Sequence, residues 1–484
     1  MKLVELLKGI DVKSVSGSTQ MSISGICFDS SEIKPGNLFV CIPGFKTDGH
    51  KYAPDAIKKG ASAIIAERDL GDIGVTCVIV ENARCTLAYL AANFYDYSNA
   101  KFKLIGVTGT NGKTTTTYLI KSILEEFGNK VGLIGTNQNM IGDVVIPSKH
   151  TTPDSLQLMQ LFRTMEDAGA TYVVMEVSSH ALALDRVAAC HFDVGAFTNI
   201  TQDHLDFHKT MEDYLKAKGI LFDISGTGVI NIDDGGGKYL AEHVKCEKMI
   251  TVGIENDCDI RASEIVLDEN GVEFTAEYNG EKRHASLETP GKFSVYNGLT
   301  ALGCLVATGI DFNKAVDGLR RANGVKGRVE VVDINEDYTV IIDYAHTPDG
   351  LLNVLNTIKG FAKGRVVTLF GCGGDRDLSK RAKMGKIASE LSDFCIVTSD
   401  NPRSEDPDSI IKDVLVGVKM GGGEYEVVTN RFAAIEYALD HAKKDDIILL
   451  AGKGHETYQI LSDTTIHFDE REIVRKLLGT EEKN

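Results

Sequence analysis

Residues 104–115 read LIGVTGTNGKTT, an apolar run that leads into two glycines, a lysine and two threonines. The residues that follow place Leu119, Ile123 and Phe127 at the spacing of one helix face. A strand that turns through glycine into a helix presents backbone N–H groups and the positive end of the helix dipole to a phosphate. The segment therefore predicts a parallel sheet of the P-loop ATPase type, with a phosphate-binding loop at a strand end.

The loop itself supplies the expected nucleotide contacts. Lys113 would reach the β- and γ-phosphates, and the Thr114 hydroxyl would be a ligand of Mg²⁺. The usual spacing puts a glycine five residues before Gly112, where this chain has Val107, so an ordinary glycine turn is the alternative. The motif does not say how the energy of ATP or GTP would be used. The expected contacts are Gly109, Thr110, Asn111, Gly112, Lys113, Thr114 and Thr115.

Length and pattern predict an α/β protein of about three domains, since the chain has 484 residues and a domain takes roughly 150. We place a small α/β domain at 1–98, the central P-loop domain at 99–328 and a Rossmann-like, doubly wound domain at 329–484. Strands that alternate with helices form parallel sheets. Ligands of such sheets bind at the carboxyl ends of the strands, so the loops there are the candidate site.

The composition of the chain limits the classes of partner and the cellular compartment that we expect. The formal net charge of -17 argues against nucleic acid or an anionic membrane as the main partner, although local cations can still hold a small phosphate. The ten cysteines form no CxxC pair, which is typical of free thiols in a reducing compartment. The first residues, MKLVELLKGI, are too short an apolar run for a signal peptide. We expect a cytoplasmic monomer with small-molecule partners.

Two residues of the central domain are candidate metal ligands. Glu176 ends an apolar strand, where a carboxylate is costly to bury unless it is paired or binds a metal such as Mg²⁺. Lys218 shares a predicted helix stripe with Leu215 and Phe222, and burial lowers a lysine pKa. Its neutral amine can react with CO₂ to give a carbamate, an anionic ligand. The alternatives are a structural network for Glu176 and a lysine whose ammonium reaches water.

Three predicted strands of the C-terminal domain end in charged and turn residues. Their loops read GCGGDRD at 371–377, SDNPR at 399–403 and AGKGHE at 451–456. Parallel strands would bring these loops to one edge of the sheet. There Arg403 and Glu456 would match the carboxylate and ammonium of an amino acid. A solvated turn is the alternative for each loop alone.

Together these motifs resemble the Mur ligase family, and within it the members that add the third residue of the peptidoglycan stem peptide. The resemblance spans nearly the whole chain. It rests on TGTNGKTTT (108–116), MEVSSHAL (175–182), DHLDFH (203–208), Ala217-Lys218, PGKFSVYN (290–297), GRVE (327–330), DYAHTPD (343–349), GCGGDRD, DNPR and GKGHE.

The resemblance implies an ATP-dependent ligase with Mg²⁺ as cofactor. Such an enzyme would join an amino acid to UDP-N-acetylmuramoyl-L-alanyl-D-glutamate through an acyl phosphate. It implies catalytic roles for Lys113, Glu176, His204 and Lys218, and metal ligation by Thr114, Glu176 and Lys218 as a carbamate. Further nucleotide contacts would be Asn297, Arg328, Asp343 and His346. Contacts to the UDP-sugar dipeptide would be Ser30, Thr151, Thr152, Ser178 and Arg186, and Leu184 stands where relatives often have a polar side chain.

The DNPR tetrad resembles the signature of members that take meso-diaminopimelate, because lysine-adding relatives usually lack the arginine. Arg403 could pair with the second carboxylate of diaminopimelate, whereas lysine would leave a buried guanidinium unpaired at a cost of several kcal/mol. The implied set is Arg376, Asp400, Asn401, Pro402, Arg403, Gly452 and Glu456. The alternatives are a lysine-adding member, a folylpolyglutamate synthetase-like ligase, and a motor or switch NTPase.

Overall fold

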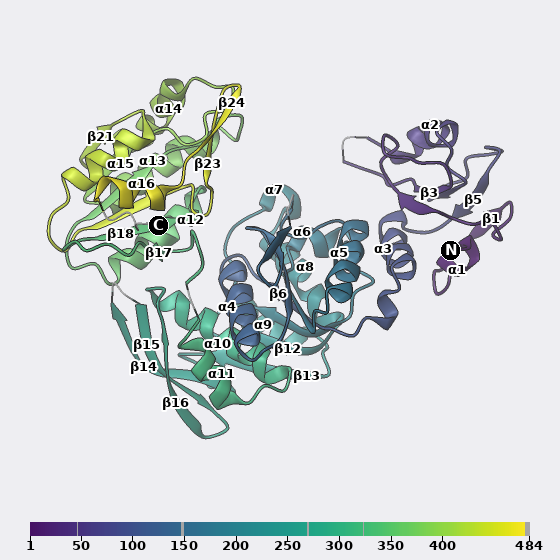
Figure 1. Ribbon diagram of the computed structural model, residues 1–484, viewed down its shortest axis with the longest axis horizontal. Coiled ribbons are helices and arrows are strands. Elements are labelled where there is room, and N and C mark those ends of the chain that lie inside the picture. The colour runs from purple at the N-terminus through teal and green to yellow at the C-terminus, as the bar shows by residue number, and fades with distance from the viewer. Residues whose placement is uncertain (46, 147–149, 269–270, 323, 480–484) are drawn as a thin grey trace. The chain divides into compact units, whose positions relative to one another are not determined.

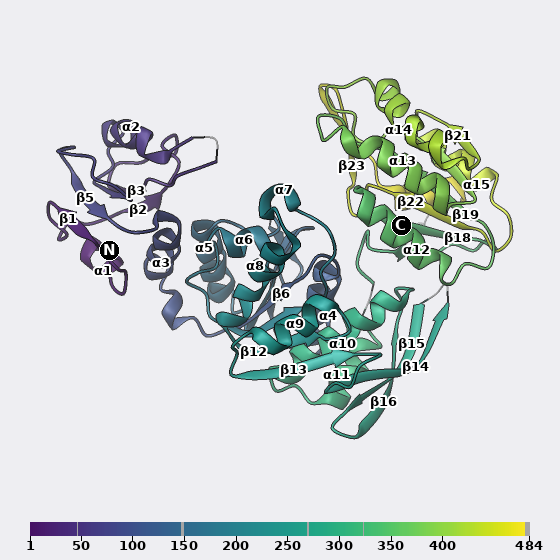
Figure 2. The same ribbon diagram turned by 180° about the vertical axis from the view of Figure 1, so that it is seen from behind.

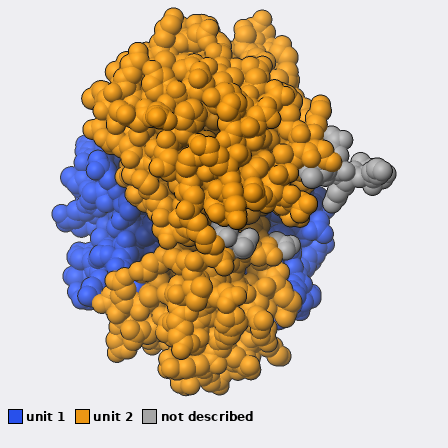
Figure 3. Space-filling view, turned by 90° about the vertical axis from the view of Figure 1, so that its left-hand side faces the viewer, with its two compact units in different colours: residues 1–251, 303–310 blue, residues 252–302, 311–484 orange. Residues whose placement is uncertain are grey.

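The computed structural model describes residues 1–45, 47–146, 150–268, 271–322 and 324–479 (Figures 1 and 2). The chain forms two compact units, residues 1–251 with 303–310 and residues 252–302 with 311–484 (Figure 3). The elements within them confirm the expected α/β class. The exact boundaries of the three expected domains stay a prediction.

The first unit begins with a five-stranded sheet in the order β1-β5-β4-β3-β2. Only β1 is antiparallel, and it lies at an edge beside β5. Helix α3 is capped by the Asn82 side chain, which accepts hydrogen bonds from two backbone N–H groups of the first turn. The elements are α1 Leu3–Leu6, β1 Ser14–Ser16, β2 Gly25–Cys27, β3 Asn37–Val40, α2 Ala53–Lys58, β4 Ala63–Ala66, β5 Thr76–Ile79 and α3 Ala83–Phe94.

The first unit also holds a parallel sheet with β6 at its centre, in the order β12-β11-β6-β10-β7. Strands β8 and β9 add an antiparallel edge beside β7. Every residue of β10 is buried, as expected for a strand covered by helices on both faces. The strands are β6 Lys103–Thr108, β7 Val131–Ile134, β8 Asn139–Ile141, β9 Val144–Ile146, β10 Tyr172–Glu176, β11 Phe192–Phe197 and β12 Ser225–Asn231. The helices are α4 Lys113–Glu126, α5 Ser155–Asp167, α6 Ser179–Ala183, α7 Leu205–His208, α8 Met211–Asp223 and α9 Gly235–His243.

The second unit contains an antiparallel meander that the sequence analysis did not predict. Strands β14 (Ile260–Asp268), β15 (Gly271–Tyr278) and β16 (Glu281–Leu287) pair in succession. Along most of β14, exposed residues alternate with buried or partly buried ones, the pattern of a sheet with one face in water. The expectation of strand–helix alternation was therefore wrong for this segment. Strand β13 (Lys248–Gly253) precedes the meander, and α10 (Lys292–Ala307) and α11 (Phe312–Leu319) follow it.

The C-terminal sheet is doubly wound, as predicted, with the order β17-β18-β22-β19-β20-β21. Helices α12, α13 and α14 pack their apolar residues on one face, and α15 and α16 pack on the other. The strands are β17 Glu330–Val331, β18 Thr339–Asp343, β19 Val366–Phe370, β20 Phe394–Val397, β21 Tyr425–Val427 and β22 Ile447–Ala451, and the hairpin β23 Tyr458–Leu461 with β24 Thr464–His467 follows. The helices are α12 Pro348–Lys359, α13 Ser379–Leu391, α14 Pro407–Gly421, α15 Arg431–Asp440 and α16 Glu470–Leu477.

Helices α13 and α14 cross at two glycines. A Cβ added at Gly385 would overlap the carbonyl oxygen of Val414, and one added at Gly417 would overlap that of Ala382. The backbones of the two helices therefore approach more closely than any side chain would allow.

Candidate active site

The predicted phosphate loop lies between β6 and α4. Gly109 and Gly112 have φ values of +147° and +85°, which favour glycine, and a Cβ at Gly109 would overlap the Thr198 hydroxyl. The Lys113 Nζ donates to the carbonyl oxygens of Gly109 and Thr110, at 2.9 Å each. The lysine thus curls back over the loop, where a phosphate would meet both the ammonium and the N-terminus of α4.

Glu176 lies at the end of β10, beside the first turn of α4. Its side chain is buried, and its Oε1 accepts hydrogen bonds from Thr114 Oγ1 at 3.0 Å and from the Thr136 N–H at 2.8 Å. Its Oε2 accepts from Thr136 Oγ1 at 3.0 Å. A hydroxyl and a carboxylate side by side are hard oxygen ligands of the kind Mg²⁺ prefers. Among the described residues, no group of three or more His, Cys, Asp or Glu is placed to hold a metal ion.

Lys218 is buried on α8, with 1% of its surface exposed. Its Nζ lies 4.3 Å from the centroid of the Tyr214 ring. Burial holds the pKa of Lys218 well below its usual value, Lys113 lowers it further, and Asp203 opposes the shift. Because the side chain is this buried, the alternative of an ammonium that reaches water is wrong for this lysine.

His204 lies near Tyr214, the residue whose ring contacts Lys218. It has a left-handed backbone, φ +53°, and an exposed side chain. Its ring lies perpendicular to that of Tyr214, at 6.1 Å between centroids, and 4.8 Å from the ring of His180. The Tyr214 hydroxyl in turn lies 3.1 Å from Thr110 Oγ1, so α8 and the phosphate loop are in contact.

Four of the five residues expected to contact the sugar peptide form one network. Thr152 Oγ1 donates to the Glu176 carbonyl at 2.9 Å and accepts from the Ser178 N–H at 3.0 Å. Arg186 donates to the Thr152 carbonyl at 2.8 Å, and the hydroxyls of Thr151 and Thr136 lie 3.0 Å apart. Ser30, the fifth, lies after β2 in the five-stranded domain, where its carbonyl accepts from Lys59. Leu184 is the C-cap of α6.

The three C-terminal loops meet at one edge of the sheet, as parallel strands require. Asn401 Nδ2 donates to Glu456 Oε2 at 2.9 Å, and the buried Lys453 Nζ lies 3.2 Å from both Asn401 Oδ1 and Glu456 Oε2. Arg403 Nη1 donates to the Gly374 carbonyl at 2.9 Å, which joins the second loop to the first. The prediction that these three loops lie together at one edge of the sheet is confirmed, whereas their role as an amino-acid site stays a prediction.

The remaining members of the expected amino-acid set differ in burial. A Cβ at Gly452, whose φ is +114°, would lie 2.7 Å from Asp400 Oδ2, so glycine is required there. Asp400 and Pro402 are buried. Arg376 is exposed and donates to the Asp375 carbonyl at 3.2 Å, which places it at the outside of the loop cluster.

Three of the four expected nucleotide contacts in the second unit, Arg328, Asp343 and His346, lie near Tyr344. The Arg328 guanidinium lies 5.3 Å from the Tyr344 ring centroid, and His346 lies 4.5 Å from it. Burial raises the pKa of Asp343, and Arg328 opposes the shift. Asn297, on α10, is buried, and its Nδ2 has no hydrogen-bond partner among the described residues.

Four residues were missed by the sequence analysis. Thr136 follows β7, a short strand that was not recognised, so its strand-end position went unseen. Lys453 and His455 lie inside the AGKGHE loop, and Tyr214 lies one residue before the Leu215 stripe, but no local pattern distinguished these three residues from their neighbours. His455 lies 4.7 Å from the Tyr344 ring, and burial lowers its pKa to about 4, with Arg328 and Arg471 adding repulsion.

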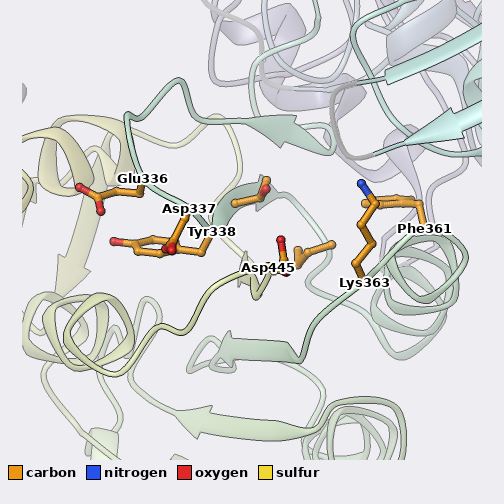
Figure 4. A pocket seen from close by; sticks show the side chains of 8 residues that line it. Glu336, Asp337, Tyr338, Phe361, Lys363 and Asp445 are labelled. Atoms are coloured by element: carbon orange, nitrogen blue, oxygen red, sulfur yellow. The ribbon is translucent and has the colours of Figure 1, made fainter.

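A cavity of about 260 Å³ lies at the opposite edge of the C-terminal sheet (Figure 4). Thr339 and Ile447, the first residues of β18 and β22, line it together with Tyr338, Lys363 and Asp445. Because ligands of such sheets bind at the carboxyl ends of the strands, this cavity is separate from the candidate site.

Three family models match the chain. The Mur ligase family catalytic domain matches residues 22–95, the Mur ligase middle domain 107–305, and the Mur ligase glutamate ligase domain 327–454. The protein named UDP-N-acetylmuramoyl-L-alanyl-D-glutamate–2,6-diaminopimelate ligase of Caldanaerobacter subterraneus subsp. tengcongensis is 50% identical, over 100% of both chains. That of Clostridium tetani is 48% identical over 99% of both. A solved structure of a ligase with the same name has a TM-score of 0.74, with 30% identity and 99% of each chain covered.

The chain therefore belongs to the Mur ligase family and is an ATP-dependent, amide-bond-forming ligase. The strand-end loops of both units carry the motifs by which it resembled that family. In the described part of the chain, no helix has the length and apolar character needed to span a bilayer.

Proposed function

We propose that this ligase adds meso-diaminopimelate to UDP-N-acetylmuramoyl-L-alanyl-D-glutamate in peptidoglycan synthesis. The observation that carries the proposal is the convergence of Asn401, Arg403, Lys453 and Glu456 at one sheet edge, with a guanidinium and a carboxylate in the same cluster. A diamino dicarboxylic acid carries both charges twice, so it suits such a cluster better than a monocarboxylate. The full-length relatives carry the name of the same activity.

Each of the three substrates would be bound by its own set of residues. The loop at 109–115 and Lys113 would bind the phosphates of ATP, together with Asn297, Arg328, Asp343 and His346. Thr151, Thr152, Ser178 and Arg186 would hold the sugar peptide, and Ser30 its uridine nucleotide. The amino acid would be held by Arg376, Asp400, Asn401, Pro402, Arg403, Gly452 and Glu456.

Chemistry would proceed in two displacements. The terminal glutamate carboxylate of the sugar peptide attacks the γ-phosphorus of ATP, which releases ADP and leaves an acyl phosphate. The amine of diaminopimelate then attacks the acyl carbon, and the collapse of the tetrahedral intermediate expels phosphate. Positioning of the three substrates would supply much of the rate, since little covalent chemistry falls to the protein.

The residues around Glu176 fit a magnesium ion. Thr114, Glu176 and Lys218 as a carbamate would hold it, because the first two lie in hydrogen-bond contact and the third is a buried lysine whose pKa is lowered by burial. The bound ion would supply electrostatic stabilisation of the phosphates. His204 would act beside it. We further propose a cytoplasmic monomer that binds no nucleic acid, in keeping with the net charge of -17.

The test is phosphate release with ATP, the sugar dipeptide and either meso-diaminopimelate or L-lysine. We expect rapid release with diaminopimelate, little with lysine and almost none without the sugar dipeptide. Lys113→Ala should abolish release with every substrate. Equal rates with lysine would indicate a lysine-adding ligase, use of a folate in place of the sugar dipeptide would indicate a folylpolyglutamate synthetase, and release without any acceptor would indicate a motor or switch NTPase.

A further inference from the structure

Thr136 makes an unusual pair of contacts with the carboxylate of Glu176. Its backbone N–H donates to Oε1 at 2.8 Å, and its hydroxyl lies 3.0 Å from Oε2. One residue therefore holds both oxygens of a carboxylate that is 1% exposed. These two bonds restrict rotation of the carboxylate about the bond that joins it to the rest of the side chain, so Thr136 fixes its plane.

The position of Thr136 follows from the register of two neighbouring strands. β7 pairs with β10 in parallel, with Leu133 opposite Val174 and Ile134 opposite Met175. Gly135 comes next and has no side chain, and a Cβ there would lie 2.5 Å from Glu176 Oε1. Because Gly135 has no Cβ, the backbone can pass close to the carboxylate, and Thr136 can contact both of its oxygens.

The same hydroxyl also lies 3.0 Å from Thr151 Oγ1. A threonine hydroxyl has one proton to donate, and an ionised carboxylate can only accept. The proton of Thr136 therefore goes to Glu176, and Thr151 is the donor to Thr136. The three groups form a chain of hydrogen bonds in which Thr151 donates to Thr136 and Thr136 donates to Glu176. The last bond is charge-assisted, so the chain is stronger than one that ends in a neutral acceptor.

We propose that Thr136 is a positioning residue that couples the sugar-peptide side of the site, at Thr151, to the nucleotide and metal side, at Glu176. The proposal rests on the function proposed above. A ligand that orders the Thr151 hydroxyl would also order the Glu176 carboxylate, so the sugar peptide and the Mg²⁺–nucleotide complex should each tighten binding of the other. Thermodynamic linkage requires the two enhancements to be equal.

The hydroxyl can be removed without removing the residue's shape. Thr136→Val keeps the volume and the backbone bond to Oε1 but loses both hydroxyl contacts. Thr136→Ser keeps the hydroxyl. Thr171→Val is the matched control. Thr171 is an exposed threonine that lies just before β10, at the end of that strand opposite to Glu176.

The measurement is calorimetric affinity for ADP with Mg²⁺, with and without saturating UDP-N-acetylmuramoyl-L-alanyl-D-glutamate, which needs no turnover. In the wild type and Thr171→Val we expect the sugar peptide to tighten ADP–Mg²⁺ binding several-fold. Thr136→Val should bind ADP–Mg²⁺ about ten-fold more weakly, the loss expected for a hydrogen bond to a charged group, and should show no enhancement. Thr136→Ser should restore both properties.

Two results would overturn the proposal: a Thr136→Val protein that keeps the wild-type enhancement, or a wild type that binds the sugar dipeptide yet shows no enhancement. A merely structural role would lower thermal stability in Thr136→Val without changing the ratio of the two affinities. Failure of the proposed function looks different, because the wild type would then bind no sugar dipeptide at all. In that case the Mg²⁺ dependence of ADP binding still decides whether Thr136 positions Glu176.

Discussion

Arg403 adopts a left-handed backbone conformation, φ +53°, that is uncommon for a residue with a long side chain. Its N–H donates to the Ile460 carbonyl, and its guanidinium is anchored on the Gly374 carbonyl. Such a conformation costs on the order of 1–3 kcal/mol and persists where the surroundings determine it. The conformation therefore aims the guanidinium at the edge shared by the three loops.

Replacing this side chain should change substrate choice more than overall activity. In Arg403→Ala we expect kcat/KM for meso-diaminopimelate to fall about 100-fold, since a paired guanidinium–carboxylate contact is lost, while any slow use of L-lysine is kept. The control is Arg320→Ala, an exposed arginine of the same unit. If Arg403→Ala still prefers diaminopimelate as strongly as the wild type, Arg403 does not read the second carboxylate.

His455 should make stability depend on pH. Its pKa is lowered from 6.5 to about 4 in the folded state, so between these values the unfolded chain binds more protons. The free energy of unfolding therefore falls as the pH falls through this window. His455→Gln should lose that part of the dependence, and its thermal midpoint should decline less steeply than the wild type's from pH 6.5 towards pH 4. Parallel curves for the two proteins would contradict the assigned cause.

For single residues, the sequence predicted where candidate side chains lie better than it predicted which groups they contact. Lys113, Glu176 and Lys218 were each chosen from a local pattern, and each lies at a strand end or on a buried helix face. The partner of Glu176 could not be found that way, because Thr136 is forty residues away and meets it only through strand pairing. Hydrogen bonds of that kind depend on register, which no local pattern reveals.

Among the elements, strand ends carry nearly all of the candidate site. β6 and β10 in the first unit, and β18, β19, β20 and β22 in the second, each end in a loop that holds expected ligand contacts, and β7 ends beside Thr136, which was not expected. Their apolar cores and glycine turns made most of these strands predictable to within two or three residues. The meander β14–β16 was missed, since its exposed face makes each strand look like a polar segment with scattered apolar residues.

A single methyl group at the end of β7 should disturb the carboxylate that β10 presents. A Cβ at Gly135 would lie 2.5 Å from Glu176 Oε1, which is buried and hydrogen-bonded and so has no room to yield. Gly135→Ala should fold, but its affinity for ADP–Mg²⁺ should fall at least ten-fold. Gly235→Ala is the control, because its Cβ would meet nothing within 4 Å. Equal affinity in both variants would show that the carboxylate can move freely.

The molecule as a whole carries a large negative charge, although its proposed phosphate loop would bind an anion. The net charge of -17 is spread over a chain whose phosphate loop depends on one lysine, two glycines and the N-terminus of α4. Backbone N–H groups and a helix dipole act over one turn, so they are compatible with an acidic surface. Binding of ATP by this protein is thus a local property, and composition alone did not exclude it.

Ligand binding should stabilise the whole molecule measurably. ADP with Mg²⁺ at about 100 times its Kd should add about 2.7 kcal/mol to the free energy of unfolding and raise the thermal midpoint. Removal of the metal with EDTA should cancel much of the rise, because Thr114 and Glu176 would lose the ion they share with the nucleotide. Lys113→Ala should show little rise in either condition. A rise that EDTA leaves unchanged would show that nucleotide binding does not depend on a metal held by Thr114 and Glu176.

The crossing of α13 and α14 has a consequence for anyone who maps tolerance to substitution along this chain. Gly385 and Gly417 admit no side chain, because the facing carbonyl groups occupy the space that a Cβ would need. A saturation screen would mark both positions as intolerant, as it would mark Gly109 and Gly112. The two pairs would look alike in survival data, yet the proposed role of one pair is to cradle a phosphate, whereas the other sets the spacing of two helices. Purified variants tested for nucleotide affinity, rather than growth, would separate them.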